Sequence, residues 1–461
     1  MHAPCAARDP ARAPLPELRA PPGPRHAFDI IFYHRPDSRW HRQTFFHLAA
    51  ALLWTENRVN ADPHGTTAAP ARPTIIAGVP AINMALYHRI RFKAGDPGAI
   101  LSVPREQGGP LAGESLIIRD VELERARRVV RADRFYAPRD LEPPPPVGPL
   151  SGDRPTATAQ AAAELIVRAG LREIWTDRTL PMIFAWHIQQ RGVSLHYDPD
   201  LGVRQRRSKD EQEVQWLRDA QRATEDAIQM ACTLIARAAP DRQGLLIHDN
   251  APLTPDRVRA AIDIFLMQRG YAGSDSIIAG GTDGGDCHNR GSAPLRTEQP
   301  IIVDVFPRSQ ETLYFGDCTR MVVHGPPGNI PDLVRSMHAA VVEAKAAAIA
   351  ATHAGTTGEA VHRVVIDVMR RRGYPMGLPT PADPPTRIAM VHGTGHGLGL
   401  DMKEQPLLDL GGPTLVAGDA VTIEPGLYAP AVGGMRLEDL VIVRDKGCEN
   451  LNTLHEGLTW T

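Results

Sequence analysis

The sequence predicts two structured domains, a smaller α/β domain followed by a larger α+β domain. Strand-like and helical segments alternate between residues 74 and 204, which is typical of an α/β fold. A long helical pattern then follows a boundary near residues 201–207. Over residues 205–461 the segments come in groups, first a strand hairpin, then a helix pair, then a strand pair. This grouping indicates an α+β fold rather than a parallel α/β sheet.

Residues 1–73 differ in composition from the rest. The first part is rich in proline, alanine and arginine, which cannot bury much apolar surface. We therefore expect a disordered leader, or a stretch translated upstream of the true start. A regulatory or docking tail is the alternative.

The composition also bears on partners and location. The net charge is −2, and no basic patch of the kind that binds nucleic acid is visible, so we expect no nucleic-acid partner. The start has no apolar segment typical of a secretory signal, and the longest apolar runs are too short to span a membrane. The 5 cysteines are scattered and form no CxxC pair, which favours a reducing compartment and hence the cytoplasm.

The elements of the first domain follow from local patterns. Short β-rich runs predict strands at 99–103, 115–119, 134–137, 173–176 and 194–197. Apolar residues at helical spacing predict helices at 121–131, 156–169 and 180–190.

The second domain begins with a helix. Ser208 and Glu211 have the spacing of a capping box, so we expect the helix to start there. Further patterns predict helices at 255–269, 331–352 and 358–372, and strands at 276–279, 300–306, 318–324, 420–423 and 437–443.

Two aspartates lie next to apolar strand segments. Asp304 interrupts the run 301–305, and Asp317 precedes the run 319–323. A buried, ionised carboxylate is costly unless a cation or hydrogen bonds compensate it. Residues 306–316 can form a hairpin turn, which would pair the strands and bring the carboxylates side by side, with a metal or a proton between them. Taken alone, the two aspartates could equally cap the turn.

Two histidines lie in a glycine-rich segment, residues 392–399. Histidine is a common metal ligand, and the glycines beside His392 and His396 let other groups approach closely. The same glycines argue against a helix. A loop with solvated histidines is the alternative.

Glu424 and Glu438 each lie within or at the end of an apolar strand, where a salt bridge could explain either one alone. Together with Asp304, Asp317 and His396, they supply four carboxylates and one imidazole. This set suits Mn²⁺, Co²⁺, Fe²⁺ or Zn²⁺. Four negative charges exceed what one divalent ion balances, so two ions with bridging carboxylates are expected.

The order of these residues resembles metallopeptidase family M24, which includes methionine aminopeptidase, Xaa-Pro aminopeptidase and Xaa-Pro dipeptidase (prolidase). The resemblance covers about residues 74–461. It implies a pita-bread domain over 205–461, preceded by an N-terminal domain over 74–204 similar to that of creatinase and prolidase. The separate N-terminal domain, the 392–396 loop and the Arg436-Leu437-Glu438 motif are more similar to the Xaa-Pro branch.

The resemblance also implies roles for the five ligands. Asp317 and Glu438 would bridge two divalent ions, of which Mn²⁺ is the most expected. Asp304 would bind one ion, and His396 with Glu424 the other. Glu424 would also be the general base that takes a proton from the attacking water.

Three further residues match positions of the family. His288 matches a histidine near the substrate amide, and His392 matches a pocket histidine that faces the residue after the cleaved bond. Arg436 matches an arginine near the site of the Xaa-Pro branch, although a strand arginine paired with a neighbouring carboxylate would look the same.

Lys403 departs from the family, which usually has a histidine there that donates a hydrogen bond to the developing oxyanion. A lysine can also donate, but it is longer and more mobile, and it could simply be solvated. The leading interpretation is a dinuclear, homodimeric peptidase that cleaves the N-terminal Xaa-Pro or Xaa-Xaa bond of a peptide. A non-peptidase hydrolase or lyase acting on a small molecule is the alternative, followed by an inactive binding module.

Overall fold

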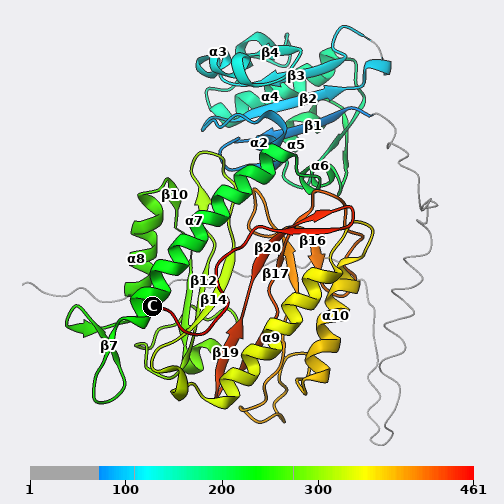
Figure 1. Cartoon of the computed structure of the whole chain (residues 1–461). Helices are drawn as coiled ribbons and strands as arrows, with labels where there is room; N and C mark the ends of the chain where they lie inside the picture. The colour runs from blue at the N-terminus through cyan, green and yellow to red at the C-terminus, as the bar shows by residue number, and fades with distance from the viewer. Residues whose placement is uncertain (1–71, 108, 274) are drawn as a thin grey trace, which may run out of the picture. The chain divides into compact units, whose positions relative to one another are not determined.

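The computed structural model describes residues 72–107, 109–273 and 275–461 (Figure 1). All but the last two positions of the predicted leader lie outside these residues. The first domain contains β1 (Thr74–Gly78), α2 (Met84–Ile90), β2 (Gly98–Val103), β3 (Gly113–Ile117), α3 (Asp120–Val129), β4 (Arg134–Tyr136), α4 (Arg154–Arg168), β5 (Glu173–Thr176), α5 (Met182–Gln190), β6 (Ser194–Tyr197) and α6 (Val203–Arg207). Within the described part of the chain, no helix has the length and apolar character that crossing a membrane requires.

These strands form one mixed sheet in the order β4-β3-β2-β1-β5-β6. In the central strand β1, neighbouring side chains face opposite sides, as the two-residue period of a strand requires. Ile75 packs with buried residues of α4 and α5, whereas Ile76 packs with those of α2 and α3. Helices therefore cover both faces of the sheet, as expected for an α/β domain.

Three elements of this domain were not predicted, β1, α2 and α6. The segment that forms β1 is a short apolar run without alternation, so its period does not separate strand from buried helix. Helix α2 did carry a start signal. The side chain of Asn83 accepts a hydrogen bond from the Leu86 amide at 2.9 Å, which is the N-cap arrangement.

Helix α7 (Glu211–Ala236) starts later than predicted. The capping box is formed by Asp210 and Glu213, which exchange side-chain and backbone hydrogen bonds of 2.8 and 3.0 Å. The prediction that Ser208 is the cap is wrong, because Ser208 ends α6 and its amide donates to the Arg204 carbonyl. The carboxylate of Asp210 is thus the first acceptor free to cap the helix.

The remaining elements form the second domain. They are β7 (Ala239–Pro240), β8 (Leu246–His248), β9 (Ala251–Pro252), α8 (Pro255–Met267), β10 (Tyr271–Ala272), β11 (Ile277–Gly280), β12 (Pro300–Val305), β13 (Arg308–Ser309), β14 (Cys318–Val323), α9 (Asp332–Ala351), α10 (Gly358–Arg371), β15 (Gly395–Gly397), β16 (Glu404–Leu408), β17 (Ala420–Ile423), β18 (Gly426–Ala429), β19 (Gly433–Arg436), β20 (Asp439–Arg444) and β21 (Gly447–Asn450).

Two sheets meet in this domain, one in the order β11-β12-β14 and one in the order β16-β15-β17-β20-β21. Helices α7 and α8 share a hydrophobic core with one side of the first sheet. Helices α9 and α10 share another core with its opposite side and with the second sheet (Figure 1). A bridge between Thr319 and Glu438 joins the two sheets. The sheets with flanking helices form an α+β domain, as predicted.

The predicted antiparallel pairing of 300–306 with 318–324 is confirmed. Strands β12 and β14 pair so that Asp304 lies opposite Thr319, and Asp317 immediately precedes β14. Both carboxylates therefore come from the same end of one strand pair, next to the bridge between the sheets.

Candidate active site

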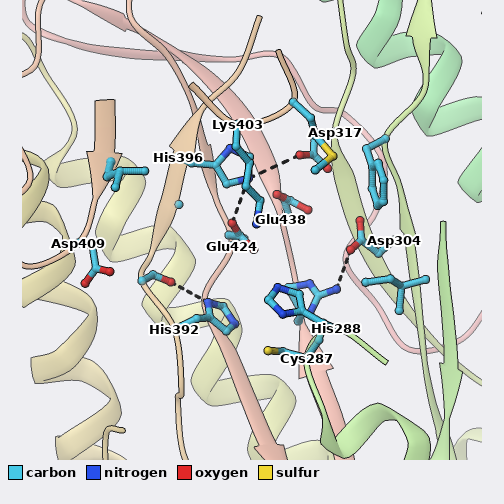
Figure 2. A pocket seen from close by; sticks show the side chains of 17 residues that line it. Cys287, His288, Asp304, Asp317, His392, His396, Lys403, Asp409, Glu424 and Glu438 are labelled. Carbon is cyan, nitrogen blue, oxygen red and sulfur yellow. Dashed lines mark hydrogen bonds and ion pairs between the residues drawn. The ribbon is translucent and has the colours of Figure 1, made fainter. Parts of the chain in front are cut away.

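A cavity of about 270 Å³ opens where the two sheets meet (Figure 2). Every residue that the sequence analysis singled out for the site lines this cavity. These residues are His288, Asp304, Asp317, His392, His396, Lys403, Glu424, Arg436 and Glu438. The structure thus brings together side chains from segments far apart in the chain, while their roles as ligands or catalytic groups stay predictions.

Each of the five predicted ligands lies in a strand or directly beside one. Asp304 belongs to β12, Asp317 precedes β14, and His396 lies in β15. Glu424 follows β17, and Glu438 lies between β19 and β20. Because strands fix the direction of each side chain, these donor groups are held by hydrogen-bonded backbone rather than by mobile loops.

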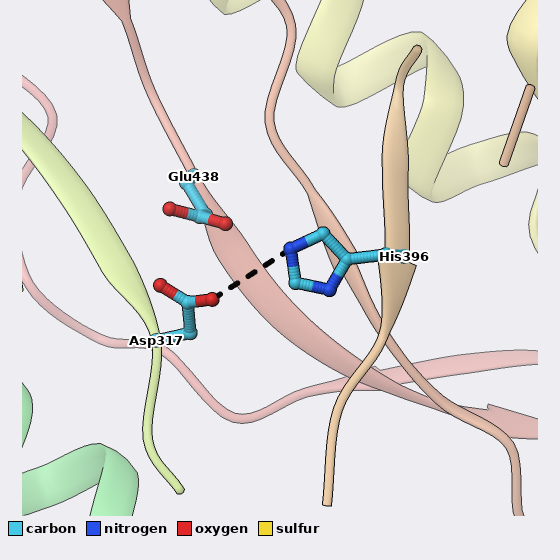
Figure 3. Close-up of side chains that lie close together, drawn as sticks. All are labelled: Asp317, His396 and Glu438. Atoms are coloured by element: carbon cyan, nitrogen blue, oxygen red, sulfur yellow. Dashed lines mark ion pairs between the residues drawn. The ribbon is translucent and has the colours of Figure 1, made fainter. Parts of the chain in front are cut away.

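Three of these side chains lie especially close together. The nearest donor atoms of Asp317, His396 and Glu438 are within 4.8 Å of one another (Figure 3). His396 Nε2 is 3.9 Å from Asp317 Oδ2 and 3.5 Å from Glu424 Oε1. His396 Nδ1 is 3.0 Å from the Gly397 carbonyl oxygen, so the proton is assigned to Nδ1. The lone pair of Nε2 then faces the carboxylates, as a metal ligand requires.

The carboxylates repel one another in a buried setting. Burial raises the pKa of Asp317 well above its usual range, and the charges of Asp304 and Glu424 raise it further. Burial and then the charge of Asp317 likewise raise the pKa of Glu438. Burial also raises the pKa of Asp304, against the opposing effect of Arg436.

This charge distribution fits bound cations. Among the described residues, the Oδ1 atom of Asp304 is buried without a hydrogen-bond partner. A buried acceptor of this kind requires a compensating group. Four carboxylates and a suitably oriented imidazole form a donor set that divalent ions of the Mn²⁺ to Zn²⁺ series accept.

Arg436 is the buried cation of the site. Its Nη2 donates to Asp304 Oδ2 at 2.7 Å, and its Nη1 donates to the Tyr428 hydroxyl at 2.8 Å. Its Nε donates to Thr319 Oγ1 at 3.2 Å. The sequence analysis left two interpretations of Arg436 open, an arginine near the site and a strand arginine paired with a carboxylate. Both describe the residue, since it lines the cavity and pairs with Asp304.

Tyr428 connects Arg436 to His392, a link that the sequence analysis missed. His392 Nδ1 is 2.8 Å from the Gly393 carbonyl and therefore carries the proton. His392 Nε2 then accepts from the Tyr428 hydroxyl at 2.9 Å. Burial lowers the pKa of His392, which is consistent with this neutral form. Both ring nitrogens are thus occupied, and the imidazole can offer a substrate only its ring.

Two predicted residues are exposed at the cavity. His288 and Lys403 both line it, and neither side chain has a hydrogen-bond partner within the described part of the chain. Both side chains can therefore contact a substrate in the cavity.

Gln221 of α7 holds Asp317 in place from the outer side. Its Nε2 donates to the Asp317 carbonyl at 2.7 Å, and its Oε1 accepts from the Asp317 amide at 3.0 Å. The sequence analysis missed this residue too. A polar side chain on the apolar face of a helix, beside Leu217 and Thr224, was the available signal.

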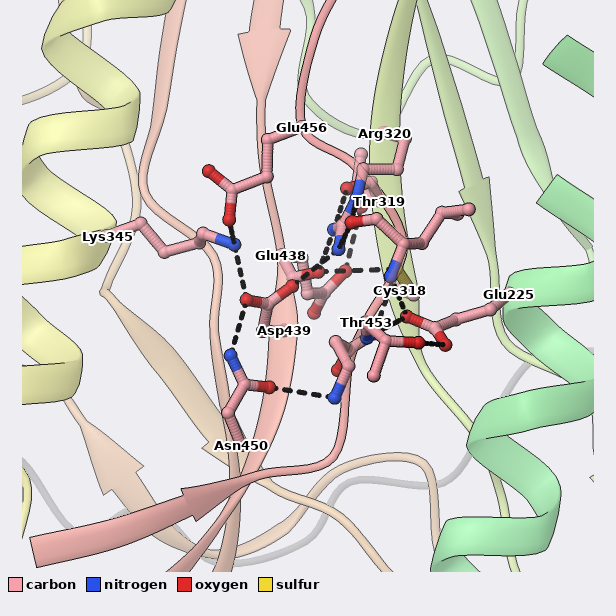
Figure 4. A network of polar contacts seen from close by, with 12 residues as sticks. Glu225, Cys318, Thr319, Arg320, Lys345, Glu438, Asp439, Asn450, Thr453 and Glu456 are labelled. Carbon is pink, nitrogen blue, oxygen red and sulfur yellow. Dashed lines mark hydrogen bonds and ion pairs between the residues drawn. The ribbon is translucent and has the colours of Figure 1, made fainter. Parts of the chain in front are cut away.

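A buried ionic network supports Glu438 from behind (Figure 4). Arg320 Nη1 donates to the Glu438 carbonyl oxygen at 2.7 Å, and its Nη2 donates to Asp439 Oδ1 at 2.8 Å. Lys345 of α9 pairs with the same Asp439 and, at 2.7 Å, with Glu456. The C-terminal segment therefore takes part in fixing the backbone that carries Glu438.

The comparison with protein families agrees with this geometry. The profile of metallopeptidase family M24 matches residues 215–445, and the chain belongs to this family. The probable dipeptidase PepE of Mycobacterium tuberculosis is 33% identical over 225 residues, which cover 47% of this chain and 55% of that protein. The Xaa-Pro dipeptidase of Pyrococcus furiosus is 29% identical over 185 residues, which cover 40% of this chain and 49% of that protein. The chain thus spans about half the length of the curated relatives it matches.

Solved structures show the same fold over a longer stretch. The Xaa-Pro dipeptidase from Bacillus anthracis superposes with a TM-score of 0.67 at 20% identity, covering 84% of this chain and 95% of that one. The X-Pro aminopeptidase from Thermotoga maritima gives a TM-score of 0.66 at 20% identity, and the superposition covers 85% of this chain and 98% of that one. The predicted fold, a pita-bread domain after a smaller α/β domain, is confirmed.

Proposed function

We propose that this chain is a dinuclear, metal-dependent peptidase that hydrolyses the first bond of a peptide, preferring proline after that bond. The convergence of four carboxylates and one imidazole on one cavity carries the proposal. Asp317 and Glu438 would bridge two ions, Asp304 would hold one, and His396 and Glu424 the other. When bound, such ions supply Lewis-acid activation of water and of the peptide carbonyl.

Glu424 is best placed to move the proton. Its side chain is 19% exposed, compared with 6% for Asp317 and 9% for Asp304, so it is the most accessible of these carboxylates from the cavity. A general base must reach the water whose proton it accepts. Glu424 can take this proton during attack and deliver it to the departing amine.

The three remaining groups would position the substrate. His392 presents an uncharged ring, which suits contact with the pyrrolidine ring of a proline after the cleaved bond. His288 can hydrogen-bond the substrate amide. Lys403 can donate to the oxyanion that develops on the carbonyl.

The proposal extends to the metal, the assembly and the location of the protein. Mn²⁺ is the metal we expect first, followed by Co²⁺, Zn²⁺ and Fe²⁺. A homodimer and a cytoplasmic location are expected from the resemblance and from the cysteine pattern.

Lys403 is the feature that favours the alternative reaction. It stands where the resemblance implies a histidine, so a hydrolase or lyase acting on a non-peptide substrate is the second candidate. The ligand set counts against an inactive binding module, which has no need to keep five converging donors.

A substrate panel tests the proposal. Metal-free protein reloaded with Mn²⁺ is assayed on Gly-Pro, Ala-Pro and Arg-Pro-Pro, with Asp317→Asn as the control for contaminating peptidases. We expect Mn²⁺-dependent release of the first residue by the wild type only. A protein that binds Mn²⁺ but cleaves no peptide in the panel would contradict the proposal and favour the alternative.

A further inference from the structure

A second cavity, of about 640 Å³, adjoins the catalytic cavity. The two share His392, Gly393 and Asp409 in their linings, so they adjoin at these residues. In Figure 2, His392 and Asp409 lie on the side of the catalytic cavity away from Asp304. The second cavity leads from there along α10, and we call it the α10 groove.

The α10 groove leaves the catalytic cavity at His392. This position determines which part of a substrate can enter the groove. In the proposed function, His392 contacts the residue after the cleaved bond. A groove that begins at His392 therefore continues toward the substrate residues further downstream. A dipeptide would end before it.

Part of the groove lining is the irregular segment that precedes β15. The backbone amides of Val391, His392 and Gly393 donate no hydrogen bond within the part of the chain that the structure describes. The next residues pair regularly, since the Thr394 amide donates to the Leu408 carbonyl at 2.7 Å. Successive amides of an extended segment point to opposite sides, so at most alternate ones can donate to the carbonyl oxygens of one extended peptide bound beside the segment.

The side chains of the groove also suit a peptide. Met376 and Ile366 supply apolar surface, and Leu410 at the rim is 63% exposed. Arg370 of α10 lies at the groove and has no ion-pair partner among the described residues. Apolar contacts can hold downstream side chains, and the free guanidinium can hold a carboxylate.

We propose that the α10 groove binds the residues of an oligopeptide that follow the cleaved Xaa-Pro bond, so that the substrate class is oligopeptides rather than dipeptides. This inference rests on the proposed function, because it requires a peptide in the catalytic cavity. It adds a binding site outside that cavity and assigns the chain to aminopeptidase rather than dipeptidase action.

The test compares peptide lengths in the Mn²⁺-loaded full chain. The substrates are Ala-Pro, Ala-Pro-Leu and Ala-Pro-Leu-Ala, and kcat/KM is measured for each. We expect kcat/KM to rise on the order of tenfold from the dipeptide to the tetrapeptide, since the added residues gain backbone hydrogen bonds and apolar contact. Leu410→Arg should lower the ratio of tetrapeptide to dipeptide kcat/KM toward one.

The matched control is Leu333→Arg, which changes an exposed leucine of α9 outside the groove and should keep the wild-type ratio. Equal kcat/KM for all three peptides, or a Leu410→Arg protein with the wild-type ratio, would overturn the inference and leave the proposed function standing. Failure to cleave any of the three peptides would overturn both.

Discussion

Replacing Gln221 with alanine should weaken metal binding although Gln221 is not a predicted ligand. The side chain is fully buried in α7 and makes three hydrogen bonds. Two of them join the amide and the carbonyl of Asp317, at 3.0 and 2.7 Å, and the third reaches Asn452 Oδ1 at 3.0 Å. The substitution removes all three and leaves backbone groups of Asp317 unpaired.

The expected size follows from these contacts. Each hydrogen bond contributes about 0.5–1.5 kcal/mol net, so the free energy of unfolding should fall by roughly 2–4 kcal/mol in the metal-free protein. Loss of a group that orients a metal ligand typically lowers metal affinity about 10–100-fold. The effect on Mn²⁺ affinity should therefore accompany the loss of stability, because Asp317 is freed to move.

The assay pairs urea denaturation of the metal-free protein with calorimetric titration of Mn²⁺. Gln229→Ala is the matched control, because Gln229 is an exposed glutamine of the same helix whose side chain donates to the Thr233 hydroxyl, away from the site. Equal Mn²⁺ affinity in Gln221→Ala and Gln229→Ala proteins would refute the positioning role of Gln221.

Substitutions at three further positions test other parts of the account. Glu424→Gln should lower kcat on Ala-Pro by about 10²–10⁴-fold, the usual contribution of a general base, and a variant with wild-type kcat would exclude Glu424 from that role. Lys403→Ala should lower kcat by about 10²–10³-fold with little change in KM if the lysine stabilises the oxyanion, and Lys403→His should restore it. Equal kcat for the wild type and Lys403→Ala would show that the lysine has no such role. The third position, Glu213, concerns stability and pH. Burial raises the pKa of Glu213, but the nearby His88 ring and the hydrogen bond from Tyr314 outweigh this effect and hold the pKa well below its ordinary value of 4.5. A depressed folded-state pKa adds stability above the unfolded-state pKa, and this stability is lost as the pH falls further. Glu213→Gln should therefore be less stable than the wild type at pH 7, and the difference should shrink below about pH 4; a difference in melting temperature that is constant from pH 3 to 7 would contradict this.

Features that follow from the energetics of a short stretch of sequence could be predicted. Asp304 in an apolar strand signalled a compensating partner, and the pairing of β12 with β14 followed from the two β-branched runs. The glycines around His396 argued against a helix, and that residue lies in a strand. Among the elements that were predicted, most boundaries differ from the structure by no more than two residues, whereas several short strands, such as β7, β13 and β15, were not predicted.

Features that depend on distant packing were not predictable. Gln221 and Tyr428 are single polar residues whose partners, Asp317 and His392, become neighbours only in the folded chain. The capping box was misplaced because Ser208 is the C-cap of the short helix α6, and its amide donates to the Arg204 carbonyl in the last turn of that helix. Which residue caps a helix is decided by competition between neighbouring elements, and residue spacing alone does not reveal the outcome.

The most direct test of the central claim is a titration of metal-free protein with Mn²⁺ while the initial rate of Arg-Pro-Pro hydrolysis is followed. The account predicts no hydrolysis without metal and a rate that reaches its plateau when two ions are bound per chain. Full activity in the presence of a strong chelator, or no hydrolysis at saturating Mn²⁺, would contradict it.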